Sequence, residues 1–99
     1  MASFKELIQS EKPVLIDFYA DWCQPCKTLS PIIKQVKEQL GAKVSVLKID
    51  VDKNPQLSQK LNIQGVPTLM IYRNGEQKWR QSGVLSAEAI IQQLQYFGA

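Results

Sequence analysis

The stretch PVLIDFYADWCQPCK, residues 13–27, joins an almost continuous apolar run to two cysteines that lie three positions apart. Residues 13–20 are rich in strand-forming residues and are interrupted only by Asp17, a pattern typical of a central strand that is covered on both faces. Cys23 and Cys26 follow where we expect a helix to begin. The sequence therefore predicts a pair of thiols at the point where a buried strand turns into a helix.

The rest of the chain predicts alternating helices and strands, and hence an α/β fold. Apolar residues after the cysteines recur at helical spacing up to Gly41, a typical helix end. Asn54 and Pro55 are favoured at the first positions of a helix, and Asn74-Gly75 favours a tight hairpin turn. This order predicts a mixed four-stranded sheet flanked by helices on both faces. The expected elements are a helix within 3–10, a strand at 13–20, a helix at 26–41, a strand at 43–51, a helix at 54–62, a hairpin of strands 68–73 and 76–82, and a helix at 87–97 capped by Ser86.

Length and charge limit the classes of protein to consider. Ninety-nine residues, of which 44% are hydrophobic, suit a single domain over residues 1–99. The formal charge is +3, but the basic residues are scattered, so we expect no nucleic-acid partner. The charged N-terminal stretch does not resemble a signal peptide, and no run is long enough to cross a membrane, so we expect a cytoplasmic protein with no membrane attachment.

Three roles are open to a close cysteine pair: a structural bridge, part of a metal site, or a redox centre. A bridge between Cys23 and Cys26 closes so small a ring that it stabilises the fold by about 2 kcal/mol before strain, against about 4.7 kcal/mol for a hundred-residue loop. A structural zinc ion needs four ligands, and the chain has two cysteines and no histidine. We therefore expect no metal, and in the cytoplasm a redox role is favoured.

The local geometry fits a redox pair. If Cys23 caps the helix, Cys26 lies one turn further on, which brings their Cα atoms to about 5–6 Å, within disulfide range. Unpaired backbone N–H groups and the positive end of the helix dipole then stabilise a thiolate at Cys23. We expect Cys23 at an exposed lip, where it attacks as the nucleophile, and Cys26 turned inward, where it resolves the intermediate.

Asp17 is the second candidate for chemistry. A carboxylate within an apolar strand has its charged form disfavoured by desolvation. In a functional role, Asp17 accepts a proton from Cys26 and returns it, directly or through water. The alternative is that Asp17 caps a turn or bonds to the backbone. We favour the functional role because an unpaired buried charge is costly.

Together these residues resemble the thioredoxin family, and the resemblance covers nearly the whole chain. It implies a thioredoxin fold and thiol–disulfide oxidoreductase activity on other proteins, through a mixed disulfide, with Cys23 and Cys26 as the redox disulfide. The segments that carry it, in the family's order and spacing, are VLIDFYADWCQPCK (14–27), SPI (30–32), KIDVDKNP (48–55), QGVPTLMIYRNGE (64–76) and SGVLS (82–86).

The resemblance also implies roles for further residues. Lys48 is expected near Asp17, where it supports proton transfer. The peptide bond before Pro67 is expected to be cis, with Pro67 beside the disulfide and the backbone of Val66 pairing with an extended substrate segment. Ordinary packing is an open alternative for Trp22. The expected substrate-docking rim consists of Trp22, Gln24, Pro25, Gly65, Val66, Pro67 and Gly83.

Cofactor and partners follow from the same resemblance. No cofactor is expected to be bound, because the family draws its electrons from NADPH through a thioredoxin reductase. The expected partners are that reductase and proteins that contain disulfides, and the expected state is a monomer.

The chain departs from the family pattern in three places. Tyr19 stands where the family commonly has tryptophan or phenylalanine, which is a mild change beside the site. Gln24 replaces the glycine that usually follows the first cysteine, at a position that tunes the reduction potential. The extra N-terminal strand of many family members is expected to be absent, which leaves the strand at 43–51 at an edge of the sheet. Two alternative functions therefore stay open: a disulfide oxidant or isomerase with a shifted potential, and a binding subunit that does not use its thiols.

Overall fold

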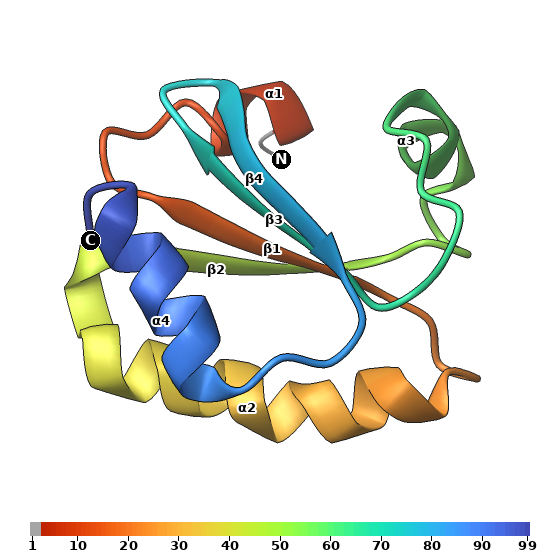
Figure 1. The fold of residues 1–99 in the computed structure, drawn as a ribbon. Coiled ribbons are helices and arrows are strands. Elements are labelled where there is room, and N and C mark those ends of the chain that lie inside the picture. The colour runs from red at the N-terminus through yellow and green to blue at the C-terminus, as the bar shows by residue number, and fades with distance from the viewer. Residues whose placement is uncertain (1–2) are drawn as a thin grey trace.

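The computed structural model describes residues 3–99 and has the expected order of helices and strands (Figure 1). One short 3-10 turn, η1, is added after the long helix, so the following strand begins slightly later than expected. The elements are α1 (Phe4–Leu7), β1 (Val14–Tyr19), α2 (Gln24–Leu40), η1 (Gly41–Lys43), β2 (Ser45–Asp50), α3 (Pro55–Lys60), β3 (Thr68–Arg73), β4 (Glu76–Ser82) and α4 (Ala87–Tyr96).

The four strands form one mixed sheet in the order β2-β1-β3-β4. Strand β1 is central as expected, parallel to β2 and antiparallel to β3. Strands β3 and β4 form the predicted hairpin, and Asn74 and Gly75 have φ values of 53° and 81°, as a tight primed turn requires. Strand β2 lies at one edge of the sheet, as expected, because no other strand within residues 3–99 pairs with its outer side.

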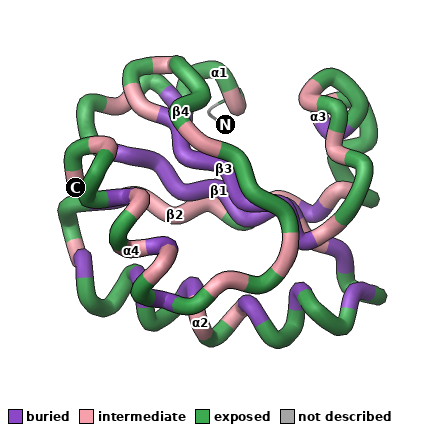
Figure 2. The backbone as a smooth tube through the Cα atoms, viewed as in Figure 1, coloured by how far each residue is buried: buried purple, intermediate pink, exposed green. Residues whose placement is uncertain are grey.

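Helices cover both faces of the sheet, which confirms the predicted layering (Figure 1). Helices α2 and α4 pack on one face, and α1 and α3 pack on the other. Because side chains alternate along a strand, β1 contributes Leu15 to the first face and Ile16 to the second. Strands β1 and β3 are buried along nearly their whole length, as the purple tube of Figure 2 shows. The core on the first face contains Leu15, Leu29, Ile33, Val36, Leu40, Val44, Leu69, Ile71, Ala87, Ile90 and Leu94.

Helix α2 carries the cysteine pair at its first turn. Its buried residues repeat at helical spacing, and each large apolar side chain contributes about 1.5–3 kcal/mol when buried. Gly41 ends the helix with a φ of 56°, a conformation that glycine adopts without steric strain. The helix connects two parallel strands, so the ends of β1 and β2 meet at the same edge of the sheet. That edge brings the cysteine turn and the loop after β2 together.

The helix caps follow the sequence with one exception. Ser86 accepts a hydrogen bond from the N–H of Ala89 at 3.1 Å, as predicted for a cap. Asn54 occupies the capping position of α3, but its side chain makes no capping bond. Its amide instead donates to the carbonyl oxygen of Asp50 at 2.9 Å, so the predicted position of Asn54 is confirmed but its side chain does not cap the helix. Within residues 3–99, no helix combines the length and the apolar character needed to cross a membrane.

Candidate active site

The cysteine pair is a disulfide at the junction of β1 and α2. The Cα atoms of Cys23 and Cys26 lie 5.3 Å apart, within the range expected for one helical turn. Cys23 caps α2, and its Sγ accepts a hydrogen bond from the backbone N–H of Cys26 at 3.1 Å. A helix N-terminus carries partial positive charge, so the same position stabilises a thiolate when the disulfide is reduced.

The predicted difference in exposure between the two cysteines is wrong. Cys23 is 3% exposed and Cys26 is 4% exposed, because Val51 and Val66 pack against the pair from neighbouring loops. The asymmetry lies in their contacts instead. The Sγ of Cys23 lies 3.6 Å from the carbonyl oxygen of Val66, whereas Cys26 lines a hollow of about 180 Å³ with Lys48 on its wall.

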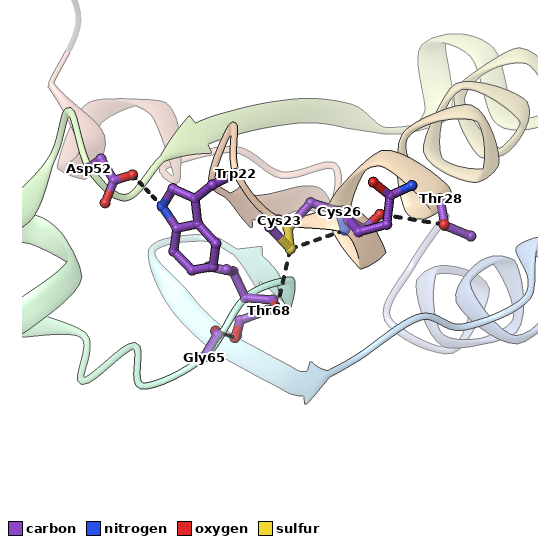
Figure 3. The surroundings of a disulfide bond; sticks show 9 residues. Trp22, Cys23, Cys26, Thr28, Asp52, Gly65 and Thr68 are labelled. Carbon is purple, nitrogen blue, oxygen red and sulfur yellow. Dashed lines mark hydrogen bonds between the residues drawn. A yellow bond between two sulfur atoms is a disulfide. The ribbon is translucent and has the colours of Figure 1, made fainter.

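A second loop, at residues 65–67, brings the predicted docking residues to the disulfide (Figure 3). The Val66–Pro67 peptide bond is cis, which confirms that expectation. Thr68 Oγ1 donates to the carbonyl oxygen of Gly65 at 2.6 Å and so ties down the loop. The N–H of Gly83, whose φ is 93°, donates to the carbonyl oxygen of Pro67 at 3.0 Å. Thr68, which the sequence did not single out, therefore helps to hold the docking loop through its hydrogen bond to Gly65.

Trp22 stands on the outer side of the disulfide. Its side chain is 70% exposed, which disfavours ordinary packing, and its indole N–H donates to the Asp52 carboxylate at 2.8 Å (Figure 3). Gln24 and Pro25 are also exposed on the adjoining first turn of α2. A groove of about 110 Å³ runs beside the indole. It is lined by Trp22, Val51, Ile63, Gln64, Gly65 and Val66.

The partner of Trp22, Asp52, was missed by the sequence reasoning. The sequence contained a signal for it, because Asp52 follows β2, whose end meets the cysteine turn at one edge of the sheet. The N–H of Asp52 donates to a carboxylate oxygen of Asp50 at 2.9 Å, so the loop that presents Asp52 is itself held by a side chain.

Asp17 is buried in the middle of β1, as predicted. It is 0% exposed, and neither carboxylate oxygen has a hydrogen-bond partner among residues 3–99. Burial raises the pKa of Asp17 from 3.8 to about 6, and the positive charge of Lys48 limits the rise. The alternative of a cap or a backbone bond is wrong for this side chain. A carboxyl with a pKa of about 6 exchanges protons readily at neutral pH.

Lys48 lies directly beside Asp17 in the sheet register but does not form an ion pair with it in the described part of the chain. Its ammonium donates to Ser30 Oγ on α2 at 3.0 Å and lies 4.9 Å from the ring centroid of Tyr19. The expectation that Lys48 lies near Asp17 is confirmed for its backbone, but its charged end points elsewhere.

The two sulfur atoms of Cys23 and Cys26 are the redox-active groups of this site. Among residues 3–99, no three His, Cys, Asp or Glu side chains are grouped so as to hold a metal ion. The roles of the individual side chains in attack, proton transfer and docking stay predictions.

Known proteins match this chain in sequence and in structure. The thioredoxin family model matches residues 1–96. A thioredoxin-like protein of Synechocystis sp. is 45% identical over 97 residues, which cover 97% of this chain and 92% of that protein. A thioredoxin of Rickettsia bellii is 42% identical over 88 residues, which cover 89% of this chain and 84% of that protein.

The solved structures agree with the sequence matches. A mutant thioredoxin from Halobacterium salinarum is 35% identical and has a TM-score of 0.86, with 100% of this chain and 88% of that chain covered. The sequence and structural similarity to thioredoxins thus extends along the chain and includes the four-stranded mixed sheet with the disulfide at the start of α2. The chain belongs to the thioredoxin family of thiol–disulfide oxidoreductases.

Proposed function

We propose that this protein reduces disulfide bonds in other proteins by dithiol–disulfide exchange. The observation that carries the proposal is the environment of Cys23. Its sulfur caps a helix and accepts a hydrogen bond from an N–H group, beside an exposed tryptophan and a groove that Trp22 and Val66 help to line. This arrangement favours a thiolate at a surface to which an extended polypeptide has access.

The first step is attack by the Cys23 thiolate on one sulfur of the substrate disulfide. A sulfur–sulfur bond forms between Cys23 and the substrate, the substrate disulfide breaks, and the second substrate sulfur leaves as a thiolate that takes a proton from water. The N–H of Cys26 and the start of α2 stabilise the attacking thiolate.

The second step resolves this mixed disulfide. Cys26 gives its proton to Asp17 and attacks Cys23 Sγ, so that the substrate leaves as a thiolate and is protonated. The substrate has then gained two electrons and two protons, and the Cys23–Cys26 disulfide has formed. Two observations support Asp17 as the proton acceptor. Its carboxylate has no hydrogen-bond partner among the described residues, and its pKa of about 6 is close to neutral pH.

Substrate docking is assigned to the exposed rim around the disulfide. The indole of Trp22 and the backbone of Val66 flank the groove, and a 2.8 Å hydrogen bond from the indole to Asp52 orients the ring. Gln24, Pro25, Gly65 and Gly83 complete the rim, whereas Pro67, which was also expected there, is buried. Aromatic and main-chain surfaces recognise extended segments with little dependence on sequence, which suits a reductase with several protein substrates.

The proposal includes a source of electrons and a compartment. The disulfide formed in each turnover is reduced by a thioredoxin reductase that draws on NADPH, and no cofactor is bound by the chain itself. A reducing compartment such as the cytoplasm, and action as a monomer, complete the proposal, because a reductase of protein disulfides needs continual supply of electrons.

An oxidant or isomerase is the second candidate function, and the exposed Gln24 between the cysteines is the observation that favours it. The reduction potential separates the two functions. A value near about −270 mV fits a reductase, whereas a value of about −180 mV or above fits an isomerase or oxidant.

Two single variants test the exchange mechanism directly. Cys26→Ser keeps the attacking thiol and removes the resolving one, so it should accumulate a mixed disulfide with a disulfide-bonded test protein. Cys23→Ser is the matched control and should accumulate none. The adducts are counted by mass spectrometry without reductant. Equal trapping by both variants, or trapping by neither, would exclude the proposed order of attack.

A further inference from the structure

The position of the Lys48 ammonium is unexpected for a charge so close to a buried carboxylate. Lys48 and Asp17 are register partners on parallel strands, and adjacent strands lie about 4.8 Å apart, so both side chains leave the same face of the sheet. A lysine side chain is long and flexible enough to reach a carboxylate at that distance. It reaches Ser30 instead.

Two contacts hold the ammonium in its observed place. Ser30 Oγ accepts its hydrogen bond at 3.0 Å, and the face of the Tyr19 ring lies 4.9 Å away, within cation–π distance. Ser30 and Tyr19 belong to α2 and β1, so the ammonium is held between the helix and the sheet. Within residues 3–99, the Ser30 hydroxyl makes no other side-chain hydrogen bond, and the Tyr19 ring makes no other cation–π contact.

Few other charged groups face Asp17. On β3 its register partner is Leu69, and the buried residues of α4 are apolar. Helix α2 packs on the face of the sheet from which the Asp17 side chain leaves, and its buried residues, Cys26, Leu29, Ile33, Val36 and Leu40, carry no formal charge. Asp21 and Lys27 also line the hollow at Cys26. Among the described residues, the positive charge of Lys48 from β2 acts on Asp17 and lowers its pKa.

Building on the proton-transfer role proposed above for Asp17, we propose that Ser30 is a positioning residue that holds the Lys48 ammonium away from Asp17. With the Tyr19 ring, its hydroxyl gives the ammonium a partner outside the buried site. Lys48 then acts on Asp17 through its charge alone and not as an ion-pair partner. A direct ion pair would lower the pKa of Asp17 and weaken it as a proton acceptor.

The same contact shapes the solvent-facing side of the site. Ser30 and Lys48 line both the hollow of about 180 Å³ at Cys26 and a larger groove of about 730 Å³ between α2 and β2. The Lys48–Ser30 hydrogen bond therefore lies between the two hollows. Its loss would free the ammonium to move and would join the hollow at Cys26 to the groove.

The test is the pKa of Asp17, measured by carboxyl ¹³C NMR on the disulfide form. Ser30→Ala should lower this pKa by about one pH unit, because the released ammonium approaches the carboxylate. Ser30→Thr keeps the hydroxyl and should leave the pKa unchanged. Thr28→Val, which removes an exposed hydroxyl on the same helix, is the matched control and should also have no effect.

A double substitution separates positioning from a general effect on structure. Lys48→Met should raise the pKa of Asp17, and Ser30→Ala added to Lys48→Met should cause no further change. A drop caused by Ser30→Ala that persists without Lys48 would overturn the proposal, as would an unchanged pKa in Ser30→Ala alone. Tyr19→Phe keeps the ring and should behave like the wild type, whereas Tyr19→Leu should lower the pKa.

These pKa measurements do not depend on turnover. If Cys26→Ser fails to trap a substrate, the proposed exchange function is excluded. The placement of Lys48 by Ser30 is then still decided by the NMR titration. If trapping succeeds and the titration shows no dependence on Ser30, the function stands and the positioning role is excluded.

Discussion

Two aspartates of nearly equal burial have opposite surroundings in this fold. Asp17 is 0% exposed and Asp50 is 7% exposed, so both carboxyl groups have lost most of their contact with water. Asp50 accepts hydrogen bonds from the backbone N–H groups of Asp52 and Lys53 at 2.9 and 3.4 Å. Asp17 has no partner among residues 3–99. Two carboxylates of similar burial therefore differ in their number of hydrogen-bond donors, and this difference is what supports the proposed proton-transfer role of Asp17.

The difference follows from the position of each residue in its strand. Asp50 ends β2, where the chain turns and its next N–H groups are free to meet a side chain. Asp17 lies in the middle of β1, where strands on both sides use the backbone groups for the sheet. A carboxylate in the centre of a sheet thus has no local backbone donors, and the charge of Lys48 offsets its burial only in part.

The largest effect is expected from removing the charge of Asp17. Its raised pKa, from 3.8 to about 6, corresponds to about 3 kcal/mol of destabilisation when it is ionised at neutral pH. Asp17→Asn should therefore raise the free energy of unfolding at pH 7 by up to about 3 kcal/mol, as measured by urea denaturation. A decrease at pH 7 would mean that the ionised carboxylate has stabilising partners.

The stability of the same variant, measured against pH, shows whether ionisation of Asp17 stabilises or destabilises the fold. The folded-state pKa lies above the unfolded one, so the folded protein holds the proton more tightly. The contribution of Asp17 is favourable to the fold when it is protonated, below about pH 4, and is lost as the pH rises through about 6. The advantage of Asp17→Asn should accordingly appear between those values. A difference that is independent of pH would point to packing and not to ionisation.

Asp17→Asn should also slow catalysis while it stabilises the fold. An amide cannot accept the proton of Cys26, and loss of a general base typically costs about a hundredfold or more. The rate at which the mixed disulfide is resolved at pH 7 should fall by about a hundredfold. Stopped-flow measurement of the release of a reduced substrate gives this rate. In the wild type the rate should fall as the pH drops below about 6. A variant that resolves the intermediate at the wild-type rate would remove Asp17 from the mechanism.

The matched change at Asp50 should have the opposite effect on stability. Asp50→Asn keeps an oxygen acceptor but replaces two charge-assisted hydrogen bonds by neutral ones, so the free energy of unfolding should fall by about 1 kcal/mol. Urea denaturation at pH 7 compares it directly with Asp17→Asn. If both variants shifted stability in the same direction, the contrast between the two aspartates would be lost.

Much of the architecture was predictable because local patterns and global packing agree. The apolar run at 13–20, the turn at Asn74-Gly75 and the stop at Gly41 each indicate the element that the structure has. Asp17 was also recognisable, since one charged residue in an otherwise apolar strand is unusual. These signals depend only on residues close in sequence.

The parts of the site that were missed depend on contacts between distant segments. Asp52 meets Trp22 only because two loops converge at one edge of the sheet, and Cys23 is covered because Val66 comes from a third loop. The direction of Lys48 depends on a choice among several partners within reach of one flexible side chain. Local sequence patterns do not encode such choices, because their energies differ by about 1 kcal/mol.

The smallest expected effect concerns the third aspartate of this region, Asp52, which is positioned by Asp50 and bonds Trp22. Trp22→Phe keeps an exposed aromatic ring but removes the indole N–H, so one hydrogen bond to a carboxylate is lost. At an exposed site such a bond contributes about 1 kcal/mol or less. The KM for a protein substrate should rise by a few-fold with kcat little changed, since the role proposed for the ring is to orient the substrate and not to act on the sulfur atoms. Asp52→Asn, which keeps an acceptor for the indole, should have a still smaller effect. A fall in kcat equal to that of Asp17→Asn would instead place Trp22 among the groups that act in the chemical step. Asp50 and Asp52, which position the indole, would then affect the chemical step as Asp17 is expected to do.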